Sequence, residues 1–140
     1  NPVAIGGLVR CYVLAKDLDH ARQTLALVPK EHEDHAAIAA ARSALALADQ
    51  ASGAGDPTEL RAQVEANPGD HQARFDLATA LIGSGDSEGA IDQLLEIMKK
   101  GAQWNDGAAK DQLLKIFEAL GPVHDATKSG RRRLSALLFS

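Results

Sequence analysis

Residues 67–95 read NPGDHQARFDLATALIGSGDSEGAIDQLL, and this stretch decides the fold class. Asp70 is an N-cap residue, so a helix is expected from there to about Ser84. The Gly-Ser-Gly run at 83–85 predicts a tight turn, and a second helix is expected to reach Lys100. The stretch therefore predicts a pair of helices joined by a short turn.

Part of this pair recurs nearer the start of the chain. Three pairs of positions lie 69 residues apart, namely Leu8 and Leu77, Tyr12 and Leu81, and Ala21 and Ala90. That distance is about twice the period of roughly 34 residues of a tetratricopeptide repeat. Large residues fill the space between two helices, and a small alanine lets the second helix approach closely. A tetratricopeptide-like array is the favoured prediction, and a generic helical bundle is the alternative.

Helix-starting and helix-ending residues divide the remaining chain in the same way, and no strand with alternating polarity is visible. We expect an all-α fold, a right-handed α-solenoid of about eight helices in one domain over residues 1–140. The predicted helical pairs cover about 1–29, 33–67, 70–101 and 107–139. The second pair departs from the repeat because its first helix is long, and the fourth is atypical, as for a terminal cap.

Composition excludes several classes of protein. The net charge of −4 argues against a nucleic-acid binder, which needs a broad basic face. No apolar run reaches the roughly 18 residues of a membrane span, so no membrane partner is expected. The chain starts at Asn1 in helical sequence without an initiator methionine, so we expect a fragment of a longer protein.

No residue set predicts an enzyme, a cofactor or a metal site. The single cysteine, Cys11, is expected to be buried and inert. The run Glu-His-Glu-Asp-His at 31–35 fits a solvated helix start better than a metal cluster, because zinc ligands are usually spaced differently. Trp104 is expected to fill the core rather than to bind a ligand.

The first helix of each pair lines the concave groove in such arrays. The helical register places eight residues there: Val3, Gly6, Arg10 and Val13 from the first pair, and Gln72, Phe75, Thr79 and Ile82 from the third. They are mostly neutral or apolar, which favours binding of apolar segments over capture of acidic C-termini. The alternative is that these side chains pack against neighbouring helices or a missing domain.

The last helix combines a basic cluster with an apolar stripe. Its candidate binding residues are Arg131, Arg132, Arg133, Leu134, Leu137, Leu138 and Phe139. Such a helix can lie in a groove of a partner, or it can cover the apolar residues at 113–117. Both hold if the stripe docks while Arg131, Arg132 and Phe139 face outward.

The chain resembles the helical C-terminal region of bacterial thioredoxin-domain co-chaperones, the chaperedoxins. The resemblance is carried by five stretches and is strongest from Pro57 to Ser140: NPGDHQARFDLA at 67–78, LLEI at 94–97, WNDG at 104–107, LLKIF at 113–117 and RRRLSALLFS at 131–140. It implies a cytoplasmic module that binds unfolded or misfolded clients and passes them to a chaperonin and the Hsp70 system. The family's chaperonin contact carries over onto residues 131–139.

One feature of the family is absent from this chain. The thioredoxin-like domain with its Cys-x-x-Cys-like motif is missing, so the resemblance assigns no redox activity to these residues. A scaffold that binds one folded partner, with no chaperone activity, is the alternative function.

Overall fold

The computed structural model describes residues 1–139, and the all-α prediction is confirmed because this part contains helices and no strand. The elements in chain order are α1 (Pro2–Leu14), α2 (Leu18–Ala26), η1 (Lys30–His32), α3 (Ala36–Ser52), α4 (Pro57–Ala66), α5 (His71–Gly83), α6 (Ser87–Gly101), η2 (Trp104–Gly107), α7 (Ala108–Leu120) and α8 (Asp125–Leu138). Here η marks short 3₁₀ helices.

Side-chain caps fix where the helices begin. The carboxylate of Asp70 accepts the backbone N–H of Ala73 at 3.0 Å, and Asp86 accepts that of Gly89 at 2.9 Å. Asn1 caps α1 in the same way, with Pro2 in the first turn. These residues satisfy amide groups that a helix leaves without partners, which explains why sequence placed the helix starts well.

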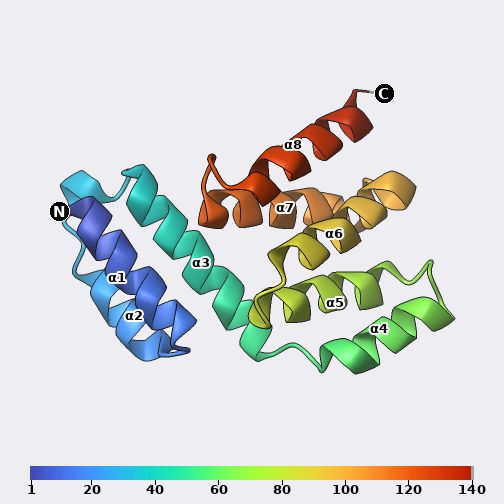
Figure 1. The fold of residues 1–140 in the computed structure, drawn as a ribbon, viewed down its shortest axis with the longest axis horizontal. Helices are drawn as coiled ribbons and strands as arrows, with labels where there is room; N and C mark the ends of the chain where they lie inside the picture. Colours follow the sequence, from blue (N-terminus) through green and yellow to red (C-terminus); the bar gives the residue numbers. More distant parts are fainter. Residues whose placement is uncertain (140) are drawn as a thin grey trace.

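The helices form two lobes that share α3 (Figure 1). In the first lobe, α1 and α2 pack against α3 around a small core of Val9, Ala21, Ala41 and Leu45. In the second lobe, α4 to α8 enclose a larger core that includes Leu77, Leu94, Leu113, Ile116 and Phe117. The two chain ends lie at opposite ends of the molecule.

The structure differs from the expected pair at 33–67. Helix α3 packs against α1 and α2 on one side and against α5 and α7 on the other, whereas α4 packs against α5. The physical reason is that α3 has apolar residues on more than one face. Ala41 and Leu45 enter the small core, while Leu47 enters the larger one. A helix buried on two sides forms a wall between lobes instead of half of a hairpin.

The internal repeat extends to the backbone of two turns. After α1, Lys16 has a left-handed φ of 61°, and after α5, Gly85 has a φ of 87°. Each turn closes with the same two hydrogen bonds: Lys16 N to Val13 O and Asp17 N to Tyr12 O in the first, and Gly85 N to Ile82 O and Asp86 N to Leu81 O in the second. This is the Schellman arrangement of a helix C-terminus.

The expectation for Cys11 is wrong, because this cysteine is exposed. Val9 is the fully buried residue of that segment. Two positions along a helix correspond to a rotation of about 200°, so Cys11 faces away from the side that Val9 buries.

None of the helices in the described part of the chain is long and apolar enough to cross a lipid bilayer.

Candidate functional site

A cleft of about 800 Å³ lies between the two lobes, and we call it the interlobe cleft. It extends from the turn after α1 to the turn after α5, with α3 between them (Figure 1). Four helices supply most of its lining from their C-terminal halves: α1 with Arg10, Val13 and Leu14, α3 with Ala44, Leu47, Ala48, Ala51 and Ser52, α5 with Ala80, Ile82 and Gly83, and α7 with Ile116, Ala119 and Leu120. The first residues of three more helices also line it, namely Leu18 of α2, Pro57 of α4 and Ser87 of α6.

Side-chain size explains why this region is hollow. Small residues recur on α3, at Ala44, Ala48 and Ala51, where larger side chains would fill the space between the lobes. Residues with long apolar side chains, such as Ile82 and Leu120, remain partly exposed there. The result is a mostly apolar, concave surface of the kind that takes apolar ligand groups.

Two contacts hold the first lobe on one side of the cleft. Arg22 of α2 pairs with Asp49 of α3 at 2.5 Å, and this hydrogen bond and charge raise the pKa of Arg22 above its usual value. Gly6 of α1 lies so close to α3 that a Cβ there would be 2.7 Å from the carbonyl oxygen of Ala37. The position of α1 relative to α3 is therefore set by direct backbone proximity as well as by a surface ion pair.

The structure brings together only some of the eight predicted groove residues. Arg10, Val13 and Ile82 line the interlobe cleft. Val3, Gly6, Gln72, Phe75 and Thr79 do not.

The contacts of these other residues explain their absence from the cleft. Phe75 packs against Trp104 with ring centroids 5.7 Å apart. The hydroxyl of buried Thr79 donates to the carbonyl of Phe75 at 3.1 Å. The amide of Gln72 donates to Asp76 at 2.9 Å, and Val3 is exposed at the other end of α1. Of the predicted residues, Arg10 and Val13 of α1 and Ile82 of α5 reach the cleft, whereas Thr79, which lies 69 residues after Arg10, does not.

Helix α8 combines a docked face with an exposed end. Leu134 is buried, and Gly130 lies against the ring of Phe117, where a Cβ would be only 2.6 Å from a ring carbon. Leu137 is partly buried against the larger core. By contrast, Leu138 and Phe139 keep 41% and 84% of their surface exposed.

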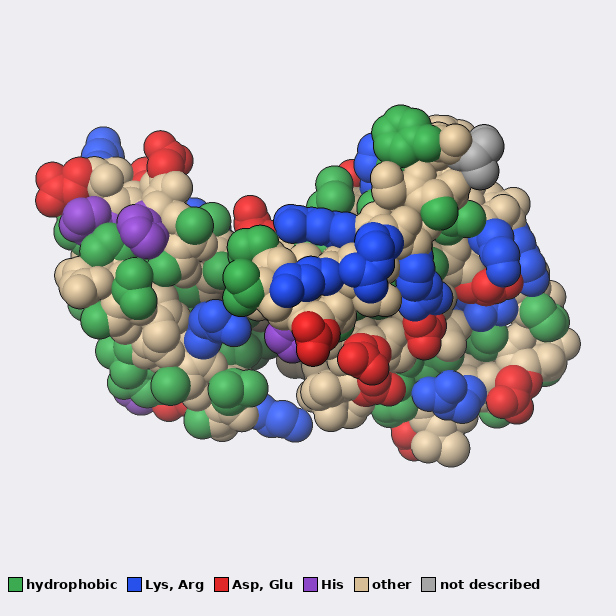
Figure 2. Space-filling model, turned by 45° about the horizontal axis from the view of Figure 1, so that its top comes forward, with side chains coloured by type: hydrophobic (Ala, Val, Ile, Leu, Met, Phe, Trp, Pro, Cys, Tyr) green, Lys and Arg blue, Asp and Glu red, His purple; other side chains and the backbone are tan. Residues whose placement is uncertain are grey.

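Two of the three arginines of α8 contact other side chains. Arg133 pairs with Asp92 of α6 at 2.6 Å, and Arg131 lies over the ring of Phe117 at 5.9 Å from its centroid. Arg132 is exposed. Figure 2 is turned so that α8 comes toward the reader, and it shows Lys and Arg side chains gathered in a band on this face.

Two further side-chain groups that the sequence singled out have structural contacts. Trp104 is half-buried between Phe75 and His71 at the edge of the larger core. In the 31–35 run, His35 caps α3 by accepting the N–H of Ala37 at 3.0 Å. No group of three or more metal-ligating side chains is found in residues 1–139.

These features define a class: an array of packed helices whose first helices form a concave surface, as in helical repeat proteins that bind other polypeptides. Comparison with known families agrees. Tetratricopeptide repeat families match residues 50–139 and residues 1–45. The chain belongs to the tetratricopeptide repeat family, which confirms the predicted helical array.

A solved structure extends the comparison. The chain is similar to a domain of protein VP0806, of unknown function, from Vibrio parahaemolyticus, with 25% identity and a TM-score of 0.56. The match covers 99% of this chain and 81% of that one. No curated protein matches the chain.

The family sets the broad function. Tetratricopeptide repeats are protein-interaction repeats, so the partners of this chain are proteins. None of the comparisons points specifically to the thioredoxin-domain co-chaperones.

Proposed function

We propose that this chain is a non-catalytic protein-binding module whose interlobe cleft takes an apolar segment of another polypeptide. The observation that supports this most is the meeting of α1, α3, α5 and α7 around one apolar hollow. Burial of apolar surface contributes about 25 cal/mol per Å² before the costs of association. Binding of this kind resists moderate salt better than binding driven by charge.

In finer terms, we propose a cytoplasmic co-chaperone module that holds unfolding clients in this cleft. The resemblance over residues 57–140 supports this reading, as does the mostly apolar lining of the cleft. We further propose that α8 docks on a chaperonin. The exposed apolar pair Leu138 and Phe139 beside Arg132 supports this second contact.

The cleft is tested by filling it. Ala48→Trp places a large side chain in the hollow. The concentration of this variant needed to suppress client aggregation is expected to rise by about tenfold or more, since one lost apolar anchor is worth roughly 1.5–3 kcal/mol. The measurement is light scattering of a thermally unfolding client, such as citrate synthase, in the presence of each variant.

Ala62→Trp is the matched control, because Ala62 is exposed on α4 and does not line the cleft. Equal suppression of aggregation by both variants would reject the cleft as the client site. If the unsubstituted protein fails to suppress aggregation at several-fold excess, client holding itself is rejected. A saturable complex with one folded partner would then favour the scaffold function.

The end of α8 is tested separately. Replacing both Leu138 and Phe139 by Ser is expected to weaken capture of a purified chaperonin at least tenfold, because two exposed apolar anchors are lost. Leu27→Ser is the control, since Leu27 is exposed on the other lobe. Pull-down measures the bound fraction, and undiminished capture by the double variant would exclude this end of α8 from the contact.

A further inference from the structure

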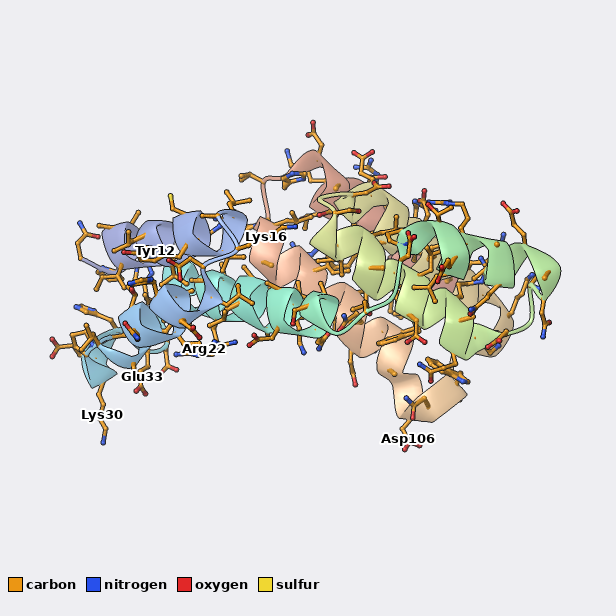
Figure 3. All side chains as sticks on the ribbon, turned by 90° about the horizontal axis from the view of Figure 1, so that it is seen from below. Tyr12, Lys16, Arg22, Lys30, Glu33 and Asp106 are labelled. Atoms are coloured by element: carbon orange, nitrogen blue, oxygen red, sulfur yellow. The ribbon has the colours of Figure 1, made fainter. Side chains whose placement is uncertain are left out.

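The interlobe cleft has charge of one sign. Among the described residues that line it, only Arg10 and Lys16 are charged, and neither makes an ion pair or a side-chain hydrogen bond. Both side chains are exposed. Figure 3 shows Lys16 at the end of α1 that faces the second lobe. The cleft therefore presents two unpaired cations beside an apolar surface.

Four carboxylates that adjoin lining residues in the sequence are held by other groups of the chain. Asp49 pairs with Arg22, and Glu118 accepts a hydrogen bond from Ser43. Asp17 and Asp86 cap the helices that follow them. None of these four is available to neutralise Arg10 or Lys16 without breaking a contact that it already makes, so the positive charge is open to a ligand.

The internal repeat gives a reference for Lys16. The equivalent turn after α5 has Gly85 in the same left-handed conformation, with the same pair of hydrogen bonds. A residue with a Cβ is less stable than glycine in this conformation. Lys16 therefore occupies a backbone position that favours glycine, and it lines the cleft.

We infer that the segment bound in the cleft carries an acidic side chain next to its apolar ones, and that Lys16 and Arg10 pair with that carboxylate. The inference rests on the proposed function and specifies its ligand: an internal apolar segment of a polypeptide with at least one Asp or Glu. Apolar contacts supply affinity, and the cations fix which segments bind and in which direction.

The dipole of α1 offers a purely structural role for Lys16, because a cation stabilises the C-terminal end of a helix. That role predicts a change in stability alone. It predicts no change in the charge of the preferred ligand, and this difference separates the two roles.

The experiment is selection of a phage-displayed library of random dodecapeptides on the immobilised protein. Apolar residues together with Asp or Glu are expected among the selected sequences. A synthetic selected peptide, compared with its Glu→Gln form, is expected to bind about fivefold more tightly, which is the upper range for one exposed ion pair. On Lys16→Glu, selection is expected to shift from acidic to basic residues.

Lys16→Gly keeps the turn in the conformation that glycine prefers, so loss of acidic preference in this variant cannot come from misfolding. Apolar peptides selected without acidic enrichment, or an unchanged charge preference in Lys16→Glu, would overturn the inference and leave the cleft as a peptide site. If the unsubstituted protein selects no peptide, both this inference and the proposed function are rejected.

Discussion

Phe117→Ala is expected to lower the free energy of unfolding by about 3–5 kcal/mol, the range for removing a buried phenylalanine ring. Phe117 is 1% exposed and belongs to the larger core. Its ring also lies against the backbone of Gly130 and under the guanidinium of Arg131. The substitution therefore removes core packing and the surface on which α8 docks.

The chain provides a control of the same residue type. Phe139 is 84% exposed at the end of α8, so Phe139→Ala is expected to change stability by less than about 0.5 kcal/mol. Urea unfolding followed by the fluorescence of Trp104, the only tryptophan, measures both variants. Trp104 reports on the larger core because it packs against that core. A loss below 1 kcal/mol in Phe117→Ala would mean that α8 is not held by this ring.

Local signals predicted the helices of this fold well. Asp70 caps a helix where the sequence placed it, and Gly85 lies in the turn expected between α5 and α6. Caps and turns are decided by a few neighbouring residues, so their chemistry is visible in the sequence. The 69-residue similarity predicted the paired helices for the same reason, because the turns after α1 and α5 have the same backbone hydrogen bonds.

The partners of α3 could not be predicted from its pattern. Periodicity shows that Ile38, Ala41 and Leu45 lie along one face, but it does not show which helix covers that face. In the structure α3 is shared by two lobes, which depends on contacts between residues far apart in sequence. The Ala-rich composition of α3 was the available signal, because small residues on several faces allow close neighbours on each.

The candidate site illustrates the same limit. Helical register placed Arg10, Val13 and Ile82 on the face that lines the cleft, and it placed Phe75 and Thr79 there too. Register fixes the direction of a side chain around the helix axis, not the distance between two helices along their length. Phe75 packs against Trp104, and Thr79 is buried with its hydroxyl bonded to the carbonyl of Phe75, so neither lines the cleft. Lys16 is not among the positions that register selects, and the structure places it in the turn after α1.

Two adjacent glycines in α1 give the second large effect, with opposite signs. Gly6→Ala is expected to destabilise the protein by about 1–3 kcal/mol, because the new Cβ would be 2.7 Å from the backbone oxygen of Ala37. Gly7→Ala is expected to stabilise it by about 0.5–1 kcal/mol, since nothing lies within 4 Å and alanine favours a helix. Thermal unfolding followed by circular dichroism measures both variants.

The comparison of Gly6 and Gly7 also connects stability to binding. Backbone cannot yield as a flexible side chain does, so Gly6→Ala must move α1 away from α3. Because Arg10 and Val13 of α1 line the interlobe cleft, that movement is expected to widen it and weaken a selected peptide severalfold, whereas Gly7→Ala leaves affinity unchanged. Equal stability and equal affinity in the two variants would show that α1 and α3 are not in close contact, and one wall of the cleft would then lie elsewhere.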